Sequence, residues 1–330
     1  MSHGNEMKIS FIYYPPSTFV KQDFEILSRH FQVEAVPYKS TGDIMNMIGP
    51  IRRSDLVFSW FASGHSFAAV MLAKIFRKRS VVVAGGYDVA FEPEINYGQY
   101  TLARHKRMYA DFALSRADAI LAVSEFTKEE VLARSKPRRV EVVYNGIDTD
   151  MFRPSGEKED LVLTVASGSN DVIRLKGLDV FAKAAGYHPN IKFMVLGLSD
   201  ADRKTLASCC SSNNVDLRGI VSRQELIGYY QRAKVYCQLS YRESFGVALA
   251  EAMACGCTPI VTRRGALSEV VGDTGYYVPY ADAEAAAEAI TEALLANQGA
   301  VVRNRIIGVF QKRIREERLI QIVESLREGD

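Results

Sequence analysis

The chain has 330 residues, a formal net charge of +2 and an apolar content of 48%. A chain of this length exceeds what one hydrophobic core usually supports, so we expect two domains of roughly 150 residues each. The small net charge gives no argument for nucleic-acid binding, and the apolar content is too high for a disordered chain.

Apolar stretches in the sequence are short. The longest, such as residues 80–84 and 119–123, fall well below the ~20 residues that a membrane-spanning helix needs. Before Met7 the chain carries Glu6, where a signal peptide would be basic and then apolar. We therefore expect a cytoplasmic protein without a transmembrane helix.

The first half of the chain alternates short runs of β-branched and aromatic residues with segments of helical periodicity. This alternation predicts βαβ units and a parallel sheet. Helices are clearest over residues 67–76 and 101–116, and Thr127 and Glu130 have the spacing of a capping box that opens another. The predicted strands are residues 8–14, 31–38, 55–61, 80–84, 119–124 and 140–144.

Residues 145–154, which read Asn-Gly-Ile-Asp-Thr-Asp-Met-Phe-Arg-Pro, continue neither pattern. Asn-Gly and the final proline interrupt regular structure, so this segment predicts the domain boundary. Beyond it, Ser222 and Glu225 form a second capping box, opening a helix to Ala233. The strands predicted in the second half are residues 161–166, 191–196, 215–218, 235–239, 258–262 and 275–278.

These elements predict an α/β fold with two doubly wound parallel-sheet domains. The first domain covers residues 1–150 and the second covers 151–309. A last helix, over about 303–327, is expected to cross back, so that residues 310–330 rejoin the first domain. Doubly wound domains joined in this way place the carboxyl ends of both sheets at one cleft, where ligands bind in such folds.

Two carboxylates mark the most informative stretch, residues 240–256. A strand ends near Ser240, Ser244 is a plausible cap, and a helix is expected from about Phe245 to Ala254. Glu243 precedes this helix and Glu251 lies two turns inside it, roughly 12 Å further along at ~1.5 Å per residue. Paired carboxylates of glycoside hydrolases stand about 5 to 9.5 Å apart. The wider spacing favours an elongated ligand over a single scissile bond.

A nucleotide sugar is such a ligand, because it has hydroxyl groups at both ends and a diphosphate between them. The diphosphate requires backbone donors at a helix N-terminus and a cation. The loop over residues 167–177, before a helix expected at about Leu178, supplies Gly168, Ser169, Arg174 and Lys176 at the carboxyl edge of the second sheet. Either cation is placed to hold a leaving diphosphate.

The sequence here resembles the retaining family-four (group 1) glycosyltransferases of GT-B fold, two Rossmann-like domains facing a central cleft, over nearly the whole chain. The matches are the Glu-x7-Glu signature from Glu243 to Glu251 with its Glu-Ala-Met-Ala-Cys-Gly ending, Lys176-Gly177, Val123-Ser124 and the segment that starts at Asn145.

The resemblance implies that Glu243 contacts the donor sugar, Glu251 the ribose and Lys176 the diphosphate. The backbone of Phe245, Gly246 and Val247, next to Ser244, would contact sugar and phosphate. It also implies retaining transfer from the front face, without a metal ion or other cofactor, from a UDP- or GDP-sugar. Apart from the resemblance, we expect a uracil or guanine base to be recognised by backbone and side chains of residues 218–221, which begin with Arg218. Asp148-Thr-Asp150 imitates a metal-binding Asp-x-Asp, but it lies in the hinge segment.

Three departures from the family pattern concern the cation and the acceptor. The family's upstream arginine is Asp171 here, so Arg174 is expected to replace it. The His-Gly-x-Asp after the fourth strand is Gly85-Gly-Tyr-Asp88. We expect Asp88 to remain near the reaction centre as a catalytic residue, and His65, in a loop after the third strand, to substitute for the histidine. The glycine-rich loop after the first strand is Tyr13-Tyr-Pro-Pro16, which predicts an altered acceptor site.

Aromatic residues of the first half form either an acceptor platform or ordinary packing; they are Tyr13, Tyr14, Trp60, Tyr87, Tyr97 and Tyr100. Basic clusters at residues 52–53, 77–79, 106–107 and 136–139 are either solvated helix ends or a face for anionic phospholipid or a phosphate-bearing acceptor.

The sequence thus predicts a glycosyltransferase acting on a hydroxyl acceptor that is a glycan, lipid-linked or a small molecule, with peripheral contact at the inner membrane face as one option. Two alternatives stay open: a non-catalytic GT-B protein that binds nucleotide or a partner, and a nucleotide-sugar epimerase on the same fold.

Overall fold

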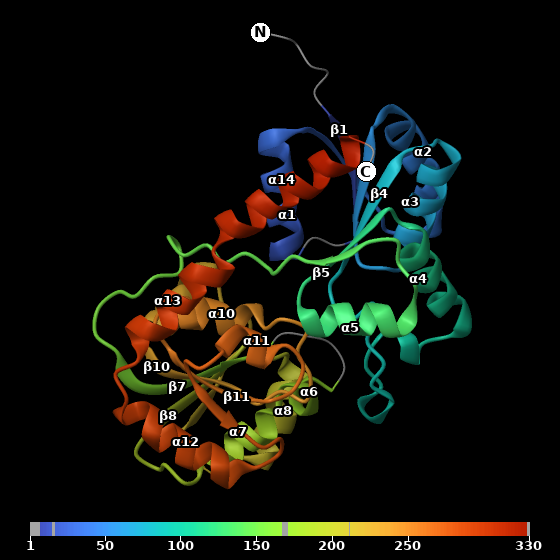
Figure 1. Cartoon of the computed structure of the whole chain (residues 1–330). Helices are drawn as coiled ribbons and strands as arrows, with labels where there is room; N and C mark the ends of the chain where they lie inside the picture. The colour runs from blue at the N-terminus through green and yellow to red at the C-terminus, as the bar shows by residue number, and fades with distance from the viewer. Residues whose placement is uncertain (1–6, 15–16, 167–170, 211, 329–330) are drawn as a thin grey trace. The chain divides into compact units, whose positions relative to one another are not determined.

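The computed structural model of the chain describes residues 7–14, 17–166, 171–210 and 212–328. The chain divides into two compact units (Figure 1). Unit 1 comprises Met1–Gly146 and Arg313–Asp330, and unit 2 comprises Ile147–Lys312. The domain boundary expected after residue 150 lies close to this division, and the C-terminal segment belongs to unit 1.

Unit 1 is built on a parallel sheet with the strand order β2-β1-β3-β4-β5-β6. The order reverses between β1 and β3, which defines a doubly wound sheet. Its strands are β1 (Lys8–Tyr13), β2 (Gln32–Pro37), β3 (Leu56–Trp60), β4 (Arg79–Ala84), β5 (Ala119–Ala122) and β6 (Val140–Val142). Buried apolar residues occupy β3 and β5 along their whole described length apart from Ser59, as expected for strands covered on both faces.

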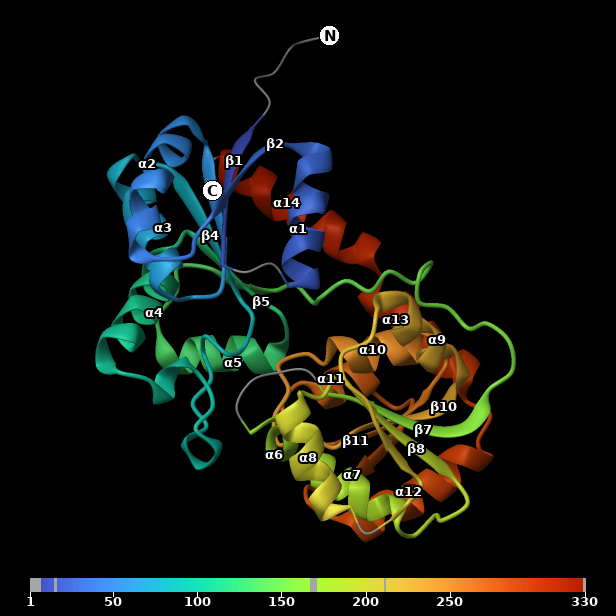
Figure 2. The same ribbon diagram turned by 180° about the vertical axis from the view of Figure 1, so that it is seen from behind.

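Helices cover both faces of this sheet: α1 and α14 lie on one face and α2 and α3 on the other (Figures 1 and 2). The helices of unit 1 are α1 (Thr18–His30), α2 (Ile44–Arg53), α3 (Gly64–Ile75), α4 (Arg104–Arg116), α5 (Glu125–Arg134) and α14 (Lys312–Glu328). Short 3₁₀ turns are η1 (Thr41–Asp43), η2 (Pro93–Ile95) and η3 (Gln99–Thr101).

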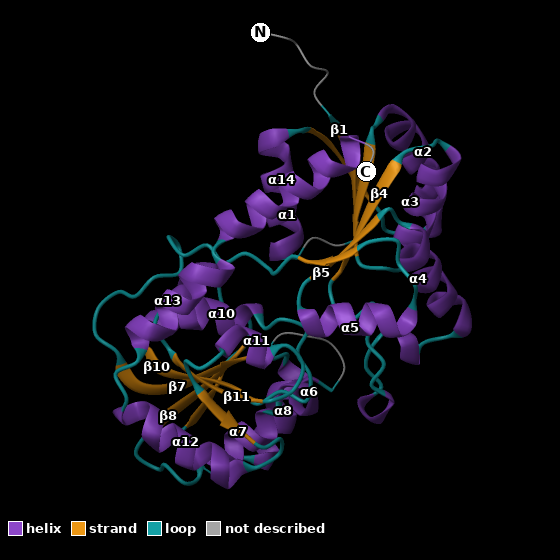
Figure 3. Ribbon diagram, in the orientation of Figure 1, coloured by secondary structure: helices purple, strands orange, loops and turns teal. Residues whose placement is uncertain are grey.

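Unit 2 repeats the architecture with the strand order β9-β8-β7-β10-β11-β12, again parallel throughout its described pairs (Figure 3). Here the order reverses between β7 and β10. The strands are β7 (Glu159–Val165), β8 (Lys192–Leu196), β9 (Val215–Leu217), β10 (Ala233–Gln238), β11 (Thr258–Thr262) and β12 (Tyr276–Val278). The helices are α6 (Val172–Lys176), α7 (Leu178–Ala185), α8 (Asp200–Cys209), α9 (Arg223–Arg232), α10 (Val247–Ala254), α11 (Leu267–Val271), α12 (Ala283–Leu295) and α13 (Gly299–Phe310).

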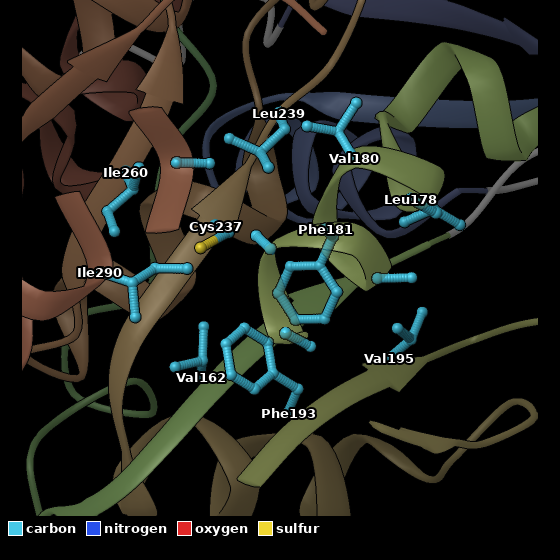
Figure 4. Packing of buried hydrophobic residues seen from close by; sticks show 14 of the residues in the cluster. Val162, Leu178, Val180, Phe181, Phe193, Val195, Cys237, Leu239, Ile260 and Ile290 are labelled. Carbon is cyan, nitrogen blue, oxygen red and sulfur yellow. The ribbon is translucent and has the colours of Figure 1, made fainter. Parts of the chain in front are cut away.

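The core of unit 2 joins its central strands to α7 and α12. Figure 4 shows Phe181 of α7 and Phe193 of β8 pointing toward each other, with ring centroids 5.3 Å apart in an edge-to-face arrangement. Cys237 of β10 and Ile290 of α12 are fully buried in the same cluster. This packing fixes the central strands whose carboxyl ends lead into the candidate site.

Several helix boundaries differ from those predicted. Helix α3 begins at Gly64, so His65 lies in its first turn and not in a loop. Helix α5 is capped by Ser124, whose side chain accepts from the Thr127 backbone N–H, so the expected cap at Thr127 is wrong. The capping box of Ser222 and Glu225 is confirmed.

The last helix, expected to be continuous over 303–327, is divided at Gln311 into α13 and α14. The break has a physical cause in the chain after β6. The backbone N–H of Ile147 donates to Phe310 O at 2.7 Å, and the Lys312 N–H donates to Ile147 O at 2.9 Å. These bonds use backbone groups that a continuous helix would pair internally.

Candidate functional site

The candidate site of unit 2 lies where β7 and β10 end, which is the point where the strand order reverses. Ligands of open α/β sheets bind at this point, outside the carboxyl ends of the strands. The chain after β7 leads through residues 167–170 into α6. Gly168 and Ser169, two of the predicted donor-site residues, lie outside the described residues.

Lys176 and Glu243 meet at this edge. Lys176 ends the short helix α6, and Glu243 lies in the loop between β10 and α10. The ammonium donates to Glu243 Oε1 in an ion pair whose side chains are only 15% and 12% exposed. The structure therefore brings together two predicted site residues that are 67 positions apart, and it combines a cation with a carboxylate acceptor.

A buried polar network fixes the Glu243 carboxylate from the strand side. Gln238 Nε2 donates to Glu243 Oε1 at 3.0 Å and to Ser240 Oγ at 2.7 Å. Ser240 Oγ donates to Glu243 Oε1 at 3.3 Å, and Tyr236 OH donates to Gln238 Oε1 at 3.0 Å. Gln238 was not among the residues predicted from the sequence; its signal was an amide in the otherwise apolar end of a central strand, where a buried polar group needs partners.

Backbone contacts join the three loops of the site. The Tyr241 N–H donates to Leu175 O at 2.9 Å, which ties the chain beside Glu243 to α6. The Ala266 N–H donates to Glu243 O at 2.9 Å, which ties it to the loop after β11. Gly265 has φ +61°, and a β-carbon there would overlap Glu243 O. Gly265 was likewise absent from the residues predicted from the sequence.

Replacing Gly265 by alanine should therefore displace the loop that carries Glu243. Both the left-handed backbone conformation and the overlap with Glu243 O oppose a side chain, so we expect a loss of about 1–3 kcal/mol in the free energy of unfolding, measured by urea unfolding. Gly228→Ala is the matched control, because it lies inside α9 with open space around its Cα and should be stabilising by about 0.5–1 kcal/mol. Equal unfolding midpoints for the two variants would contradict this packing of Gly265 on Glu243.

Glu251 lies inside α10 and is only 8% exposed. Its Oε2 accepts from Tyr230 OH at 3.5 Å, and its Oε1 lies 3.9 Å from Arg223 Nη2. Burial raises the pKa of the Glu251 carboxyl to about 7, and the nearby Arg223 and Tyr230 act in the opposite direction. A carboxyl of this kind changes its charge near neutral pH.

The turn into α10 differs from the prediction in its cap. The helix begins at Val247, after Gly246 with φ +92°, and Ser244 is not the cap. Ser244 Oγ instead accepts from Arg242 Nη1 at 3.0 Å. Phe245 is buried and packs edge-to-face on Phe310 of α13 with ring centroids 5.4 Å apart.

The two predicted arginines of the donor site lie at different places in unit 2. Arg174 is in α6 and exposed, two residues before Lys176, so residues 172–176, which were expected to be part of a loop, are helical. Arg218 follows β9, where its guanidinium donates to Asp216 Oδ2 at 2.9 Å and to Tyr229 OH at 3.0 Å. Its proposed contact with a base stays a prediction.

In unit 1, Asp88 is 1% exposed and joins two loops. Its Oδ2 accepts from the Ala62 N–H at 2.7 Å, and its Oδ1 accepts from Gly85 and Gly86 N–H at 3.0 and 2.8 Å. Burial raises the pKa of the Asp88 carboxyl, against the opposing effect of these backbone donors. Through these hydrogen bonds Asp88 links the loop after β3 to the loop after β4. Its catalytic role stays a prediction.

His65 is the centre of an aromatic cluster at the carboxyl edge of the sheet in unit 1. Its Nε2 bonds to Trp60 O and its Nδ1 to Ser63 Oγ at 2.8 Å. Tyr14 stacks on it with centroids 6.3 Å apart, and Tyr38 lies 5.6 Å away. Burial lowers the pKa of the His65 imidazole, so the ring is neutral at pH 7.

The other aromatic candidates of unit 1 lie elsewhere. Tyr87 is 44% exposed and packs edge-to-face on Tyr97 with centroids 5.2 Å apart. Trp60 and Tyr100 are buried in the core. The packing interpretation therefore holds for Trp60 and Tyr100, whereas Tyr14 is half-exposed beside His65.

Membrane spans and metal clusters are not found among the described residues. In that part of the chain no helix is both long and apolar enough to cross a membrane. Among the same residues no group of three or more His, Cys, Asp and Glu side chains is placed to hold a metal ion. Asp148 of the Asp-x-Asp segment accepts from the Met151 N–H at 3.0 Å.

Solved structures share this two-domain architecture. Sucrose-phosphate synthase from Thermosynechococcus elongatus superposes with a TM-score of 0.78 at 16% identity, covering 98% of this chain and 100% of that one. Alr3699/HepE from Anabaena, in complex with UDP, gives 0.77 at 15% identity, covering 97% and 100%. With its two doubly wound parallel sheets, the chain has the GT-B fold.

Family models match both units. The model described as Glycosyl transferases group 1 matches residues 149–307, and the model described as Glycosyltransferase Family 4 matches residues 29–151. The chain therefore belongs to the group 1, family 4 glycosyltransferases.

Curated relatives include two enzymes named for inositol-containing substrates. A phosphatidylinositol N-acetylglucosaminyltransferase subunit from Arabidopsis thaliana is 27% identical over 224 residues, 63% of this chain and 49% of the relative. The D-inositol 3-phosphate glycosyltransferase of Arthrobacter sp. strain FB24 is 33% identical over 159 residues, which are 42% of this chain and 38% of that relative. The chain thus matches at most about half the length of these relatives.

Proposed function

We propose that this chain is a glycosyltransferase that moves a sugar from a nucleotide-diphosphate donor, UDP- or GDP-linked, to a hydroxyl group of an acceptor. The observation that carries the proposal is the pair of Lys176 and Glu243 at the switch point of unit 2. One residue offers a cation for phosphate and the other offers a carboxylate for sugar hydroxyls, side by side where ligands of such sheets bind.

The donor is held by unit 2 in this proposal. Lys176 binds the diphosphate, and the backbone N–H groups at the start of α10 add the positive end of a helix dipole. Glu243 accepts from the sugar hydroxyls. Glu251, about one turn into α10, accepts from the ribose hydroxyls. The two carboxylates thus bind the two ends of one elongated ligand.

Transfer proceeds with retention at the anomeric carbon. The bond from that carbon to the diphosphate oxygen breaks while a bond to the acceptor oxygen forms on the same face, and the acceptor proton passes to the departing phosphate. Lys176 and the α10 N-terminus stabilise the charge that develops on the leaving group. Protein groups perform this task in the proposed mechanism, with no metal ion or other cofactor.

The acceptor is held by unit 1. The half-exposed Tyr14 and the neighbouring Tyr38 offer aromatic faces beside His65 at the carboxyl edge of the sheet, and aromatic rings pack well against sugar or cyclitol rings. Since the two curated relatives are named for inositol phosphate and phosphatidylinositol, we include phosphorylated cyclitols and their lipid-linked forms in the acceptor class. A lipid-linked acceptor would imply a cytoplasmic enzyme with peripheral contact at the inner membrane face, to which the basic clusters of unit 1 would be suited.

The experiment is a calorimetric titration of the purified chain with UDP, GDP and their common sugar conjugates, followed by a transfer assay. The assay offers glycans, inositol phosphates and phosphatidylinositol vesicles as acceptors and measures release of nucleotide and glycosylated product. Binding of one nucleotide sugar together with product formation supports the proposal. Binding without turnover on any acceptor would favour the non-catalytic alternative, and release of a free 2-epimer would favour an epimerase.

Donor binding should depend on the ionisation of Glu251. Its carboxylate form accepts both ribose hydroxyls, and its pKa of about 7 leaves most of the group protonated at pH 6. The dissociation constant of the nucleotide sugar should therefore rise about tenfold from pH 8 to pH 6. A nucleotide sugar is the right probe, because its diphosphate lacks the terminal phosphate that itself titrates near pH 6.

Glu251→Gln is the control for this pH dependence. The amide cannot titrate, so the variant should bind the nucleotide sugar with one weakened affinity across pH 6 to 8. A wild-type dissociation constant that stays flat over this range would remove Glu251 from the ribose site.

A further inference from the structure

The proposed diphosphate-binding cation has a partner of its own. Lys176 donates to Glu243 Oε1, and each side chain is more than four-fifths buried. A diphosphate needs the same ammonium. Any ligand phosphate that reaches Lys176 therefore weakens or replaces an ion pair that is partly shielded from water, where the cost of separating charges is higher than at an exposed surface.

The carboxylate cannot easily follow the ammonium. Gln238 and Ser240, at the end of β10, hold Glu243 Oε1 at 3.0 and 3.3 Å. The loop backbone is fixed by the bond from Ala266 N–H to Glu243 O. When Lys176 turns toward a phosphate, the negative charge of Glu243 stays in place with two neutral donors.

We propose that Glu243 competes with the diphosphate for Lys176 and so makes the site discriminate against free nucleoside diphosphate in favour of the nucleotide sugar. The inference rests on the proposed function. A donor sugar brings hydroxyl groups that donate to Glu243. These hydrogen bonds replace the one that Glu243 loses when the Lys176 ammonium turns to the diphosphate. A free nucleoside diphosphate brings no such hydroxyl, so its binding to Lys176 leaves the Glu243 carboxylate without a replacement for the ammonium.

This competition gives the ion pair a task in turnover. The product nucleotide that remains after sugar transfer has lost the group that satisfied Glu243. Return of the Lys176 ammonium to Glu243 then assists release of the nucleotide. Inhibition by the product nucleotide is therefore weaker than expected from the affinity of the site for the nucleotide sugar. Gln238 acts here as a positioning residue, since it reaches the ligand only through Glu243.

The test measures the affinities of two ligands, the free nucleotide and the nucleotide sugar, before and after the charge of Glu243 is removed. The chain and its Glu243→Gln and Glu243→Ala variants are titrated by calorimetry with UDP or GDP, whichever the wild type binds, and with the corresponding nucleotide sugar. We expect both variants to bind the free nucleotide about tenfold more tightly and the nucleotide sugar more weakly. Glu284→Gln, which removes an exposed carboxylate at the start of α12, should change neither affinity.

If Glu243 had a purely structural role, its replacement would weaken the binding of both ligands. Opposite changes in the two affinities are therefore the diagnostic result. Titrating the same Gln variant in a Lys176→Gln background isolates the competition, and the gain for free nucleotide should fall below threefold there. A gain that stays tenfold would show simple repulsion and overturn the inference. Wild-type nucleotide binding with no gain in either Glu243 variant would overturn it too, whereas a wild type that binds no nucleotide would overturn the proposed function itself.

Discussion

Replacing Lys176 by alanine should lower kcat/KM for glycosyl transfer by about a hundred- to a thousandfold. In the proposed mechanism the ammonium stabilises charge that grows on the departing diphosphate, and loss of one such donor has an effect of about this size in other enzymes. Glu243 keeps its bonds from Gln238 and Ser240 in the variant, so unit 2 should stay folded. Initial rates with saturating acceptor, at several donor concentrations, measure the change.

Lys183→Ala provides the matched control for Lys176. Lys183 is a lysine of α7 in the same unit, its side chain is 64% exposed, and its nearest carboxylate oxygen, on Asp179, is 3.9 Å away. This variant should keep wild-type kcat/KM. If Lys176→Ala retained activity within threefold of Lys183→Ala, the diphosphate would have to be held by another cation, and Arg174 would be the residue to replace next.

The strands could be predicted from the sequence with little error. Each predicted strand has a counterpart among the described residues, with ends that differ by at most two positions. Parallel strands buried on both faces appear as continuous runs of valine, isoleucine and leucine, as in Arg79–Ala84 and Ala119–Ala122, and such runs are hard to mistake for surface segments. The central cleft expected between the two domains stays a prediction.

Helix ends were less predictable because tertiary contacts decide them. Residues 303–327 have no proline, and their one glycine does not coincide with the break at Gln311. The break depends on Ile147, more than 160 positions earlier, which pairs with the chain on either side of Gln311. No local signal reports such a partner.

In the candidate site, too, some residues could be predicted from the sequence and others depend on tertiary contacts. Lys176 and Glu243 could be identified because each lies in a distinctive motif at the end of a strand. The groups that position them could not: Gln238 and Gly265 carry no motif, and their importance comes from contacts with Glu243 across the site. The spacing of residues in a motif indicates which of them contact a ligand. The contacts that position those residues depend on tertiary packing, which the motif does not report.

A second consequence of packing is the buried ion pair between Asp23 of α1 and Arg315 of α14, which no sequence pattern indicated. The guanidinium bonds both carboxylate oxygens at 2.6 and 2.7 Å, and the two side chains are 0% and 2% exposed. Arg315 Nη1 also donates to Val143 O and Tyr144 O at 2.6 and 2.8 Å, and Trp60 Nε1 donates to Asp23 Oδ2 at 3.0 Å. The cluster fastens the C-terminal helix to the body of unit 1.

Arg315→Ala should lower the free energy of unfolding by about 3–5 kcal/mol, because it leaves the Asp23 carboxylate buried without its counter-ion. Urea unfolding followed by fluorescence is well suited to measure this, since Trp60 is the one tryptophan of the chain and lies in the cluster itself. Arg313→Ala, on the same helix with a side chain that is 71% exposed, should change the free energy by less than about 0.5 kcal/mol.

A double variant separates the ion pair from general damage to α14. Asp23→Ala combined with Arg315→Ala removes both charges, so its cost should be smaller than the sum of the two single costs by more than about 1 kcal/mol. Additive costs would mean that the two side chains act independently. In that case the attachment of α14 to unit 1 would depend on its apolar face, where Leu319, Ile322 and Val323 are buried.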